Sequence, residues 1–286
     1  MDAIAEELGM DPVAVRRRNL ISLDEMPYER DLDVLGDAVS HDTGDYEGLL
    51  DQALEGVGWD DLQADLERRR ANGEMVGAGL IMYIDKSGLG PSDGARIAVD
   101  EAGDIEVVTG GASVGQGFET AMAQICAGAL GADYRRIRVI HGQTDRIPYG
   151  IGAHASRATV LTGSAVNATA LKLREIALEM ASELLQSPVD GLDIVDGTVI
   201  VRDDPSGPSV TLGEVAQALA PESAARGDRD PGLKAEEFFH TEHQTYPYGV
   251  HIAVVKVDAE TGRSEIERYY VAYDIGRAVN PKMVIG

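Results

Sequence analysis

A glycine-rich segment, Gly110 to Gly117, follows a strand-like stretch and opens a helix that extends to about Leu130. Glycines let the backbone take left-handed conformations and let a ligand approach it closely. Because a helix begins here, its first backbone N–H groups can face an anion. A tight turn without a ligand is the equal alternative, and the glycine spacing differs from the dinucleotide-binding fingerprint. The segment therefore predicts a strand–loop–helix unit with a candidate anion site.

Helical and strand-like stretches alternate irregularly along the rest of the chain. Apolar residues recur at helical spacing over 1–8, 12–18, 46–57, 59–72, 118–130, 164–185 and 212–219. Strands are predicted over 75–84, 95–100, 105–109, 137–141, 248–258 and 264–274, with a hairpin around 196–197. Runs of both kinds in this order predict an α+β fold with mixed sheets and packed helices.

The charge and the single cysteine limit which partners and cofactors the chain can have. With 25 Lys and Arg against 49 Asp and Glu, the net charge of −24 opposes binding to nucleic acid and to anionic membranes. One cysteine, Cys126, can form neither an internal disulfide nor a zinc cluster. Since there is neither an apolar run of about 18 residues nor a secretory leader, no membrane span and a cytoplasmic location are expected. The acidic surface fits adaptation to high salt, whereas the excess of Arg over Lys also fits a GC-rich genome.

A second polar loop joins the strand over 137–141 to the long helix over 164–185. Loops of about twenty residues inside a compact domain are usually functional. Ser156 is a candidate phosphate contact, but it also precedes a helix and suits a capping role. Arg157 can clamp a phosphate with two N–H groups or pair with a nearby carboxylate. His154 has no metal-binding partner near it in the sequence, so a loop histidine is the simpler interpretation.

Four motifs along the chain have a shared order and spacing. They are residues 1–19, the Gly115-Gln116-Gly117-Phe118-Glu119-Thr120 stretch with Gln124, residues 142–150 with Ala155-Ser156-Arg157, and residues 245–249 with 274–281. In this order they resemble the molybdopterin-binding large subunit of the xanthine dehydrogenase/aldehyde oxidase family. The style of the last motif is closest to aerobic carbon monoxide dehydrogenase large subunits.

The resemblance implies a domain assignment and a set of cofactor contacts. Residues 1–24 would end the first molybdopterin-binding domain, 25–74 would be a connecting segment with amphipathic helices, and 75–286 would form the second, truncated domain. The implied cofactor is a molybdenum–molybdopterin cytosine dinucleotide, whose dithiolene holds the metal without a direct protein ligand. The implied cofactor-binding residues are Gly115, Gln116, Gly117, Phe118, Thr120, Thr144, Ala155, Ser156 and Arg157.

The resemblance also implies an activity and partners for the complete protein. Such a molybdenum hydroxylase oxidises an aldehyde, an N-heterocycle or CO with an oxygen derived from water. Electrons leave through 2Fe–2S clusters on a small subunit and FAD on a medium subunit, in a dimer of heterotrimers. The family's catalytic Glu is expected beyond Gly286, and Ala158 stands where the family commonly has Ser or Thr. The chain is therefore expected to be an internal fragment, inactive alone.

Two other functions are compatible with the same residues. The chain can be a cofactor-binding module of a split gene, which needs a second chain for activity. It can also be an acidic interaction domain that keeps the fold without a cofactor or catalysis. Molybdenum content separates both cofactor-binding hypotheses from the interaction domain.

Overall fold

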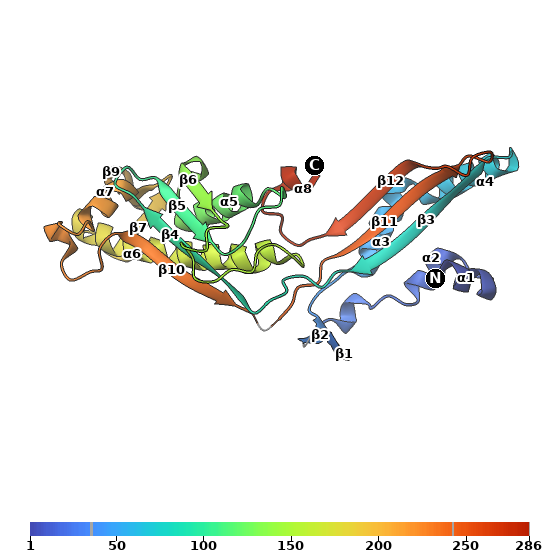
Figure 1. Ribbon diagram of the computed structural model, residues 1–286, viewed down its shortest axis with the longest axis horizontal. Helices are drawn as coiled ribbons and strands as arrows, with labels where there is room; N and C mark the ends of the chain where they lie inside the picture. Colours follow the sequence, from blue (N-terminus) through green and yellow to red (C-terminus); the bar gives the residue numbers. More distant parts are fainter. Residues whose placement is uncertain (35–36, 242, 286) are drawn as a thin grey trace. The chain divides into compact units, whose positions relative to one another are not determined.

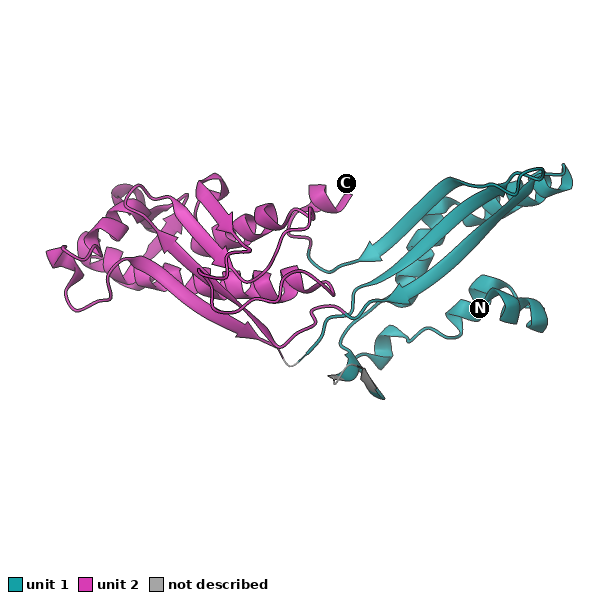
Figure 2. Cartoon of the chain, viewed as in Figure 1, with its two compact units in different colours: residues 1–86, 243–277 teal, residues 87–242, 278–286 magenta. Residues whose placement is uncertain are grey.

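The computed structural model describes residues 1–34, 37–241 and 243–285. The chain divides into two compact units (Figure 2), which we call unit 1 (Met1–Lys86 and His243–Arg277) and unit 2 (Ser87–Glu242 and Ala278–Gly286). Strand pairing joins 75–84 to 248–274 within unit 1, and the domain boundaries at residues 24 and 74 stay a prediction. Each unit is therefore built from segments that lie far apart in the sequence.

Unit 1 is built on a three-stranded antiparallel sheet in the order β12-β11-β3. Its strands are β3 (Met75–Ile84), β11 (Tyr248–Val257) and β12 (Ser264–Asp274), as predicted within one residue. Helices α3 (Tyr46–Val57) and α4 (Trp59–Ala71) pack on this sheet, and both were predicted. The apolar stripe of α3, with Leu50 and Ala53 wholly buried, supplies much of this core.

The N-terminal part of unit 1 contains short elements. Helices α1 (Asp2–Leu8) and α2 (Pro12–Arg17) were predicted, and the Asp11 carboxylate caps α2 by accepting from the backbone N–H of Ala14. A 3₁₀ turn (Leu23–Glu25) and a hairpin of β1 (Tyr28–Val34) and β2 (Asp37–His41) follow. The predicted connecting segment thus contains a strand pair as well as the two amphipathic helices.

Unit 2 contains a four-stranded sheet in the order β10-β4-β5-β6, packed against two helices (Figure 1). The strands are β4 (Ser92–Val99), β5 (Ile105–Thr109), β6 (Ile137–Ile140) and β10 (Leu233–His240). The helices are α5 (Phe118–Leu130) and α6 (Ser164–Leu185), and a π-helical turn over Ala158–Gly163 precedes α6. Wholly buried core residues include Ile97, Val107, Leu130, Leu173 and Ala177.

Smaller elements complete unit 2. A second sheet of β7 (Leu192–Val195), β8 (Thr198–Val201) and β9 (Asp204–Thr211) turns at the predicted Asp196-Gly197 hairpin. Helix α7 (Leu212–Ala218) begins with a capping box between Thr211 and Glu214, and α8 (Pro281–Ile285) is short. Short 3₁₀ turns lie at Tyr134–Arg136, Val189–Gly191 and Ala224–Arg226.

Strand β10 was not predicted from the sequence, and neither were β1, β2, β9 and α8. Strand β10 pairs antiparallel with β4 at the edge of the sheet and alternates buried Leu233 and Ala235 with exposed neighbours. Its two adjacent glutamates, at 236 and 237, hide this alternation in the sequence. The mixture of helices and sheets confirms the predicted α+β class. In the described part of the chain, no helix has the length and apolar character that crossing a bilayer requires.

The connectivity gathers several loops at one edge of the unit 2 sheet. Strands β5 and β6 run parallel, so both end at this edge, and antiparallel β4 begins there. Helices α5 and α6 follow β5 and β6, and therefore also begin on this side. We call the edge marked by Ser92, Thr109 and Ile140 the loop edge. It receives the segments over 87–91, 110–117 and 141–157.

Candidate functional site

The glycine-rich loop at the loop edge takes left-handed conformations at two of its glycines. Gly115 has φ of 96° and Gly117, which is the N-cap of α5, has φ of 74°. A Cβ built on Gly115 would meet no atom within 4 Å, so the backbone there is open to a ligand. A Cβ on Gly117 would lie 1.7 Å from Met283 Cε. Glycine at 117 is thus favoured by conformation, whereas the Met283 methyl group, at the end of a flexible side chain, could move aside.

The Gln116 side chain is exposed but is folded back onto its own loop. Its Oε1 accepts from the Val114 N–H at 2.7 Å, and its Nε2 donates to the Ala112 carbonyl at 3.1 Å. A glutamine amide has two N–H groups and two lone pairs on its oxygen, so one donor and one acceptor position are left over. Gln116 can therefore shape the turn and still contact a ligand.

An acidic side chain that the sequence analysis did not select supports this loop. The Glu119 carboxylate accepts from the Ser113 hydroxyl at 3.1 Å and lies 2.8 Å from His141 Nε2. Its own backbone N–H, then His141 and Ser113, lower the pKa of Glu119. His141 follows β6, and its ring meets the buried Phe118 ring edge-on at 5.5 Å between centroids. Glu119 lies at the start of the helix that follows β5, and His141 follows β6. Because parallel strands end at the same edge of a sheet, the sequence could have indicated that these two residues lie close together.

The remaining residues predicted on these loops differ in exposure. Phe118 has its ring in the core, so only its backbone N–H, in the first turn of α5, can serve a ligand. Thr120 is exposed in the same turn. Thr144 is exposed in the loop after β6. The structure brings Phe118 and Thr120 to the start of one helix, whereas Thr144 is on a separate stretch of the loop edge.

The second predicted loop contains two successive non-glycine residues in the left-handed region. Ala155 has φ of 47° and Ser156 has φ of 53°. The Ala155 carbonyl accepts from the Gly88 N–H at 3.1 Å, which joins this loop to the segment before β4. Left-handed residues with a side chain are disfavoured and cluster at functional sites.

Arg157 occupies a position that differs from the predicted phosphate contact. Its side chain has no exposed surface, and Nη1 lies 3.1 Å from Asp93 Oδ2, in a pair whose two side chains are both inaccessible. The other N–H groups donate to the carbonyls of Leu89, Ser92 and Gly152, at 3.1, 2.7 and 3.0 Å. The sequence left two arrangements open for Arg157, a phosphate clamp and a pair with a carboxylate. The structure has the pair with a carboxylate, and the buried guanidinium is inaccessible to a phosphate.

The two predicted loops are in direct backbone contact. A Cβ on Gly110 would lie 2.3 Å from the Tyr149 carbonyl oxygen, and one on Gly150 would lie 2.5 Å from the Gly110 oxygen. The Gly152 N–H donates to the same Gly110 oxygen at 3.4 Å. Only glycine permits this approach. The glycine-rich loop and the second loop thus touch at the loop edge.

The third predicted motif is divided between the units. Within unit 1, the Tyr248 hydroxyl donates to Asp274 at 2.8 Å and accepts from the Asp45 N–H at 2.9 Å. Burial is the main cause that raises the pKa of Tyr248 to about 12. Within unit 2, Asn280 donates to Gln124 of α5 at 3.1 Å. The aromatic part of this motif therefore stabilises unit 1, and only its C-terminal part borders α5.

Cys126 lies in α5 as a buried apolar residue, as predicted. It has no exposed surface, and burial raises the pKa of its thiol to about 12. The thiolate that a nucleophile needs is therefore disfavoured. Among the residues that the structure describes, no group of three or more His, Cys, Asp or Glu is placed to hold a metal ion.

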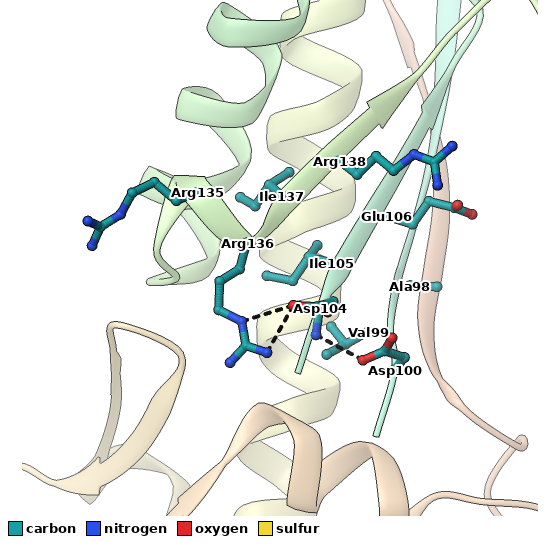
Figure 3. Close-up of a pocket in the computed structure, with 10 residues that line it drawn as sticks. All are labelled: Ala98, Val99, Asp100, Asp104, Ile105, Glu106, Arg135, Arg136, Ile137 and Arg138. Carbon is teal, nitrogen blue, oxygen red and sulfur yellow. Dashed lines mark hydrogen bonds and ion pairs between the residues drawn. The ribbon is translucent and has the colours of Figure 1, made fainter. Parts of the chain in front are cut away.

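A pocket of about 600 Å³ lies at the edge of the unit 2 sheet opposite to the loop edge (Figure 3). It is lined by the end of β4 and the starts of β5 and β6. Arg136 pairs with Asp104 at 2.9 Å, and Arg135 pairs with Asp133 at 2.7 Å. These arginines are neutralised by adjacent carboxylates, so the pocket offers a ligand little net charge and is not part of the candidate site.

The loop edge offers donors that suit an anionic ligand with many acceptor atoms. The first N–H groups of α5 have no acceptor within the helix, and the positive end of the helix dipole faces the same side. Thr109, the last residue of β5, has a buried hydroxyl oxygen without a hydrogen-bond partner among the described residues. Such an orphaned group at the loop edge is a candidate contact for a polar ligand, whereas the open glycine backbone lies at Gly115.

Comparison with known proteins extends over the whole chain. Residues 52–286 match the family model described as "Molybdopterin cofactor-binding domain". The 6-hydroxypseudooxynicotine dehydrogenase complex subunit gamma of Paenarthrobacter nicotinovorans is 35% identical over 98% of this chain and 35% of its own length. The carbon monoxide dehydrogenase large chain of Hydrogenophaga pseudoflava is 30% identical over 100% of this chain and 36% of its own. The chain thus spans about a third of the curated relatives that it matches.

Solved structures share the fold along nearly the entire chain. Reconstituted CO dehydrogenase from Oligotropha carboxidovorans superimposes with a TM-score of 0.87 at 28% identity, over 99% of this chain and 36% of that one. Quinoline 2-oxidoreductase from Pseudomonas putida 86 gives a TM-score of 0.87 at 28% identity, over 99% and 37%. The chain therefore belongs to the molybdopterin cofactor-binding domain family and is related to carbon monoxide dehydrogenase large chains and other members of the xanthine dehydrogenase family.

Proposed function

We propose that this chain is the part of a molybdenum hydroxylase large subunit that holds a molybdopterin cytosine dinucleotide at the loop edge of unit 2. The observation that carries the proposal is the backbone contact between Gly110 and Gly150. Through this contact the Gly-Gln-Gly loop touches the Ala155-Ser156 loop at one edge of one sheet, and the residues of both loops resemble the family's motifs. Two loops of a single ligand site must meet in this way.

The residues at the loop edge fit such a cofactor in their chemistry. A pterin dinucleotide has a flat ring with many hydrogen-bonding atoms and phosphates with negative charge. The site offers open backbone at Gly115, the first amides of α5 and the unpartnered Thr109 hydroxyl. In a chain of net charge −24, the overall field repels an anion. Local backbone donors and helix N-termini must therefore provide the attraction.

The proposed contacts come from the glycine-rich loop and from the second loop. Gln116 would contact the cofactor with its remaining amide donor and acceptor, while its other bonds hold the loop. The amides of Gly115, Gly117 and Phe118 would approach the pterin, because Gly115 leaves the backbone uncovered. Ser156 would contact the dinucleotide. The contacts of Thr120, Thr144 and Ala155 are proposed on the resemblance of their motifs alone.

The activity of the complete protein is part of the same proposal. When bound, the cofactor supplies the metal centre that transfers oxygen and electrons, and the protein supplies binding and orientation. The substrate class is an aldehyde, an N-heterocycle or CO, with the catalytic Glu on a segment outside these residues. The names of the relatives, a "large chain" and a "complex subunit", support partners with FAD and 2Fe–2S clusters, in a dimer of heterotrimers. A cytoplasmic location and inactivity of these residues alone complete the proposal.

The decisive experiment is metal and nucleotide analysis of the native protein. We expect one molybdenum per polypeptide and release of CMP on acid hydrolysis. Absence of both would contradict the proposal and favour an acidic interaction domain. The mass of the native polypeptide then separates the remaining alternatives. A chain about three times as long as 286 residues supports the large subunit, whereas a native chain of this length supports a split-gene module.

A further inference from the structure

A buried ion pair lies directly behind the second loop. Arg157 and Asp93 are both inaccessible to solvent, with 3.1 Å between Nη1 and Oδ2. Thr162, also wholly buried, donates its hydroxyl to the same Asp93 oxygen. The other oxygen, Oδ1, accepts from the Gly94 N–H at 3.0 Å. Both carboxylate oxygens therefore have partners, and the network has no position for a ligand atom.

The same network contacts three segments of the loop edge. The guanidinium donates to carbonyl oxygens of the segment before β4, of β4 and of the second loop, which are those of Leu89, Ser92 and Gly152. A Cβ on Gly110 would lie 2.6 Å from Asp93 Oδ1, so the first residue of the glycine-rich loop also rests on this carboxylate. One ion pair thus connects the bases of both loops.

Arg157 immediately follows the two left-handed residues Ala155 and Ser156. A residue with a Cβ avoids this conformation, and two in succession persist only where the surroundings hold them. On one side, the Ala155 carbonyl is bonded to the Gly88 N–H. On the other side, the Arg157 side chain is held through all three of its nitrogens. The ion pair is therefore one of the restraints on the loop conformation.

We propose that Arg157 is a positioning residue, which acts through Asp93 and Thr162 to keep Ala155 and Ser156 left-handed. This inference rests on the proposed function, since the positioned loop is one of the two that would contact the cofactor. Because its guanidinium is enclosed, Arg157 contributes preorganisation of the backbone and makes no phosphate contact. A loop that is ordered before binding loses less conformational entropy when the ligand binds.

The test begins with Thr162→Val in the complete large subunit, because this change removes one hydroxyl and keeps the volume. Hydrogen exchange, followed by mass spectrometry, is measured on the cofactor-free subunit from molybdenum-depleted cells. We expect amides over 152–157 to exchange about tenfold faster, as for loss of a buried hydrogen bond to a charged group. Amides around Leu173 in α6 should be unchanged. If these loop amides exchanged equally fast in the wild type and in Thr162→Val, the proposal would be overturned.

Glycine substitutions then test whether left-handed conformation is what the network maintains. Thr162→Val should also retain less molybdenum than wild type. Ala155→Gly or Ser156→Gly, added to Thr162→Val, should restore this retention, because glycine takes left-handed φ without strain. Ala153→Gly is the matched control, since Ala153 lies in the same loop but is not left-handed. Rescue at 155 or 156 but not at 153 supports positioning. If the network only anchors the fold, each added glycine should lower molybdenum retention further. That result would refute the positioning role of Arg157.

The two proposals fail in different ways. If the wild-type subunit contains molybdenum but the loop of Thr162→Val exchanges no faster, Arg157 has no positioning role and the proposed function stands. If the wild-type subunit contains no molybdenum, the proposed function fails. Faster loop exchange in Thr162→Val would still show that the network holds the loop, because exchange is measured without a cofactor.

Discussion

The two loops at the loop edge reach left-handed conformations by different means. The glycine-rich loop does so with Gly115 and Gly117, and its supporting contacts come from its own residues and from the exposed Glu119. The second loop does so with Ala155 and Ser156, and a wholly buried ion pair supports it. Glycine makes a conformation accessible without strain, whereas packing must impose it on other residues. The first loop should therefore tolerate loss of its contacts better than the second.

The largest effect is expected from Arg157→Met, which leaves the Asp93 carboxylate buried without its charge partner. Removal of one member of a buried pair costs about 3 to 5 kcal/mol of unfolding free energy. Chemical denaturation of the complete subunit measures this loss. As a control, Arg68→Met removes an exposed Arg that pairs with Asp65 on α4 and should change stability by less than about 1 kcal/mol. Similar losses of unfolding free energy in Arg157→Met and Arg68→Met would contradict the burial of the Arg157–Asp93 pair.

A smaller effect is expected from Gly117→Ala, at the N-cap of α5. The φ of 74° becomes strained by roughly 1 to 2 kcal/mol, and the Met283 methyl group must move. For Gly115→Ala, the unfolding free energy should fall only by the cost of the backbone strain, because the added Cβ would enter open space. Gly128→Ala, within α5 and also without a contact, should instead gain about 0.5 to 1 kcal/mol. Thermal unfolding of the three variants checks this order.

Glu119→Gln tests the electrostatic support of the first loop by its pH dependence. The folded-state pKa of Glu119 is lowered from 4.5, so its stabilising contribution is present above that value. The contribution is lost as pH falls through the lowered pKa. Wild type and variant should thus differ at neutral pH and converge in acid, measured by unfolding free energy from pH 7 to pH 3. As a control, Glu55→Gln changes an exposed carboxylate of α3 and should alter the unfolding free energy little.

The smallest effect on stability is expected from Gln116→Ala. Its side chain is exposed and bonds only to its own loop, so unfolding free energy should change by less than about 1 kcal/mol. Turnover and molybdenum content of the complete subunit should fall clearly, because the amide would lose its cofactor contact. Wild-type turnover in this variant would remove Gln116 from the site. A large loss of stability would assign it to the fold instead.

Local patterns predicted most of the secondary structure, and the reasons are local. Helices α3, α4 and α5 were predicted because apolar spacing and a glycine that follows the helix lie within a short segment, and α6 was predicted from its apolar spacing. Strand β10 was not predicted, because its adjacent glutamates hide the alternation and only pairing with β4 makes it a strand. The Glu119–His141 contact was also not predicted, since its partners are 22 residues apart.

The sequence by itself determined the family, the α+β class and the glycine-rich turn that begins α5. These depend on residue order and on conformational preferences that act within a few positions. The tertiary structure alone decided that 75–84 pairs with 248–257, that the two loops touch at Gly110 and Gly150, and that Arg157 pairs with Asp93. The two charged residues are 64 positions apart. Whether an arginine meets a ligand or a buried carboxylate depends on which segments pack around it, and no local pattern contains that information.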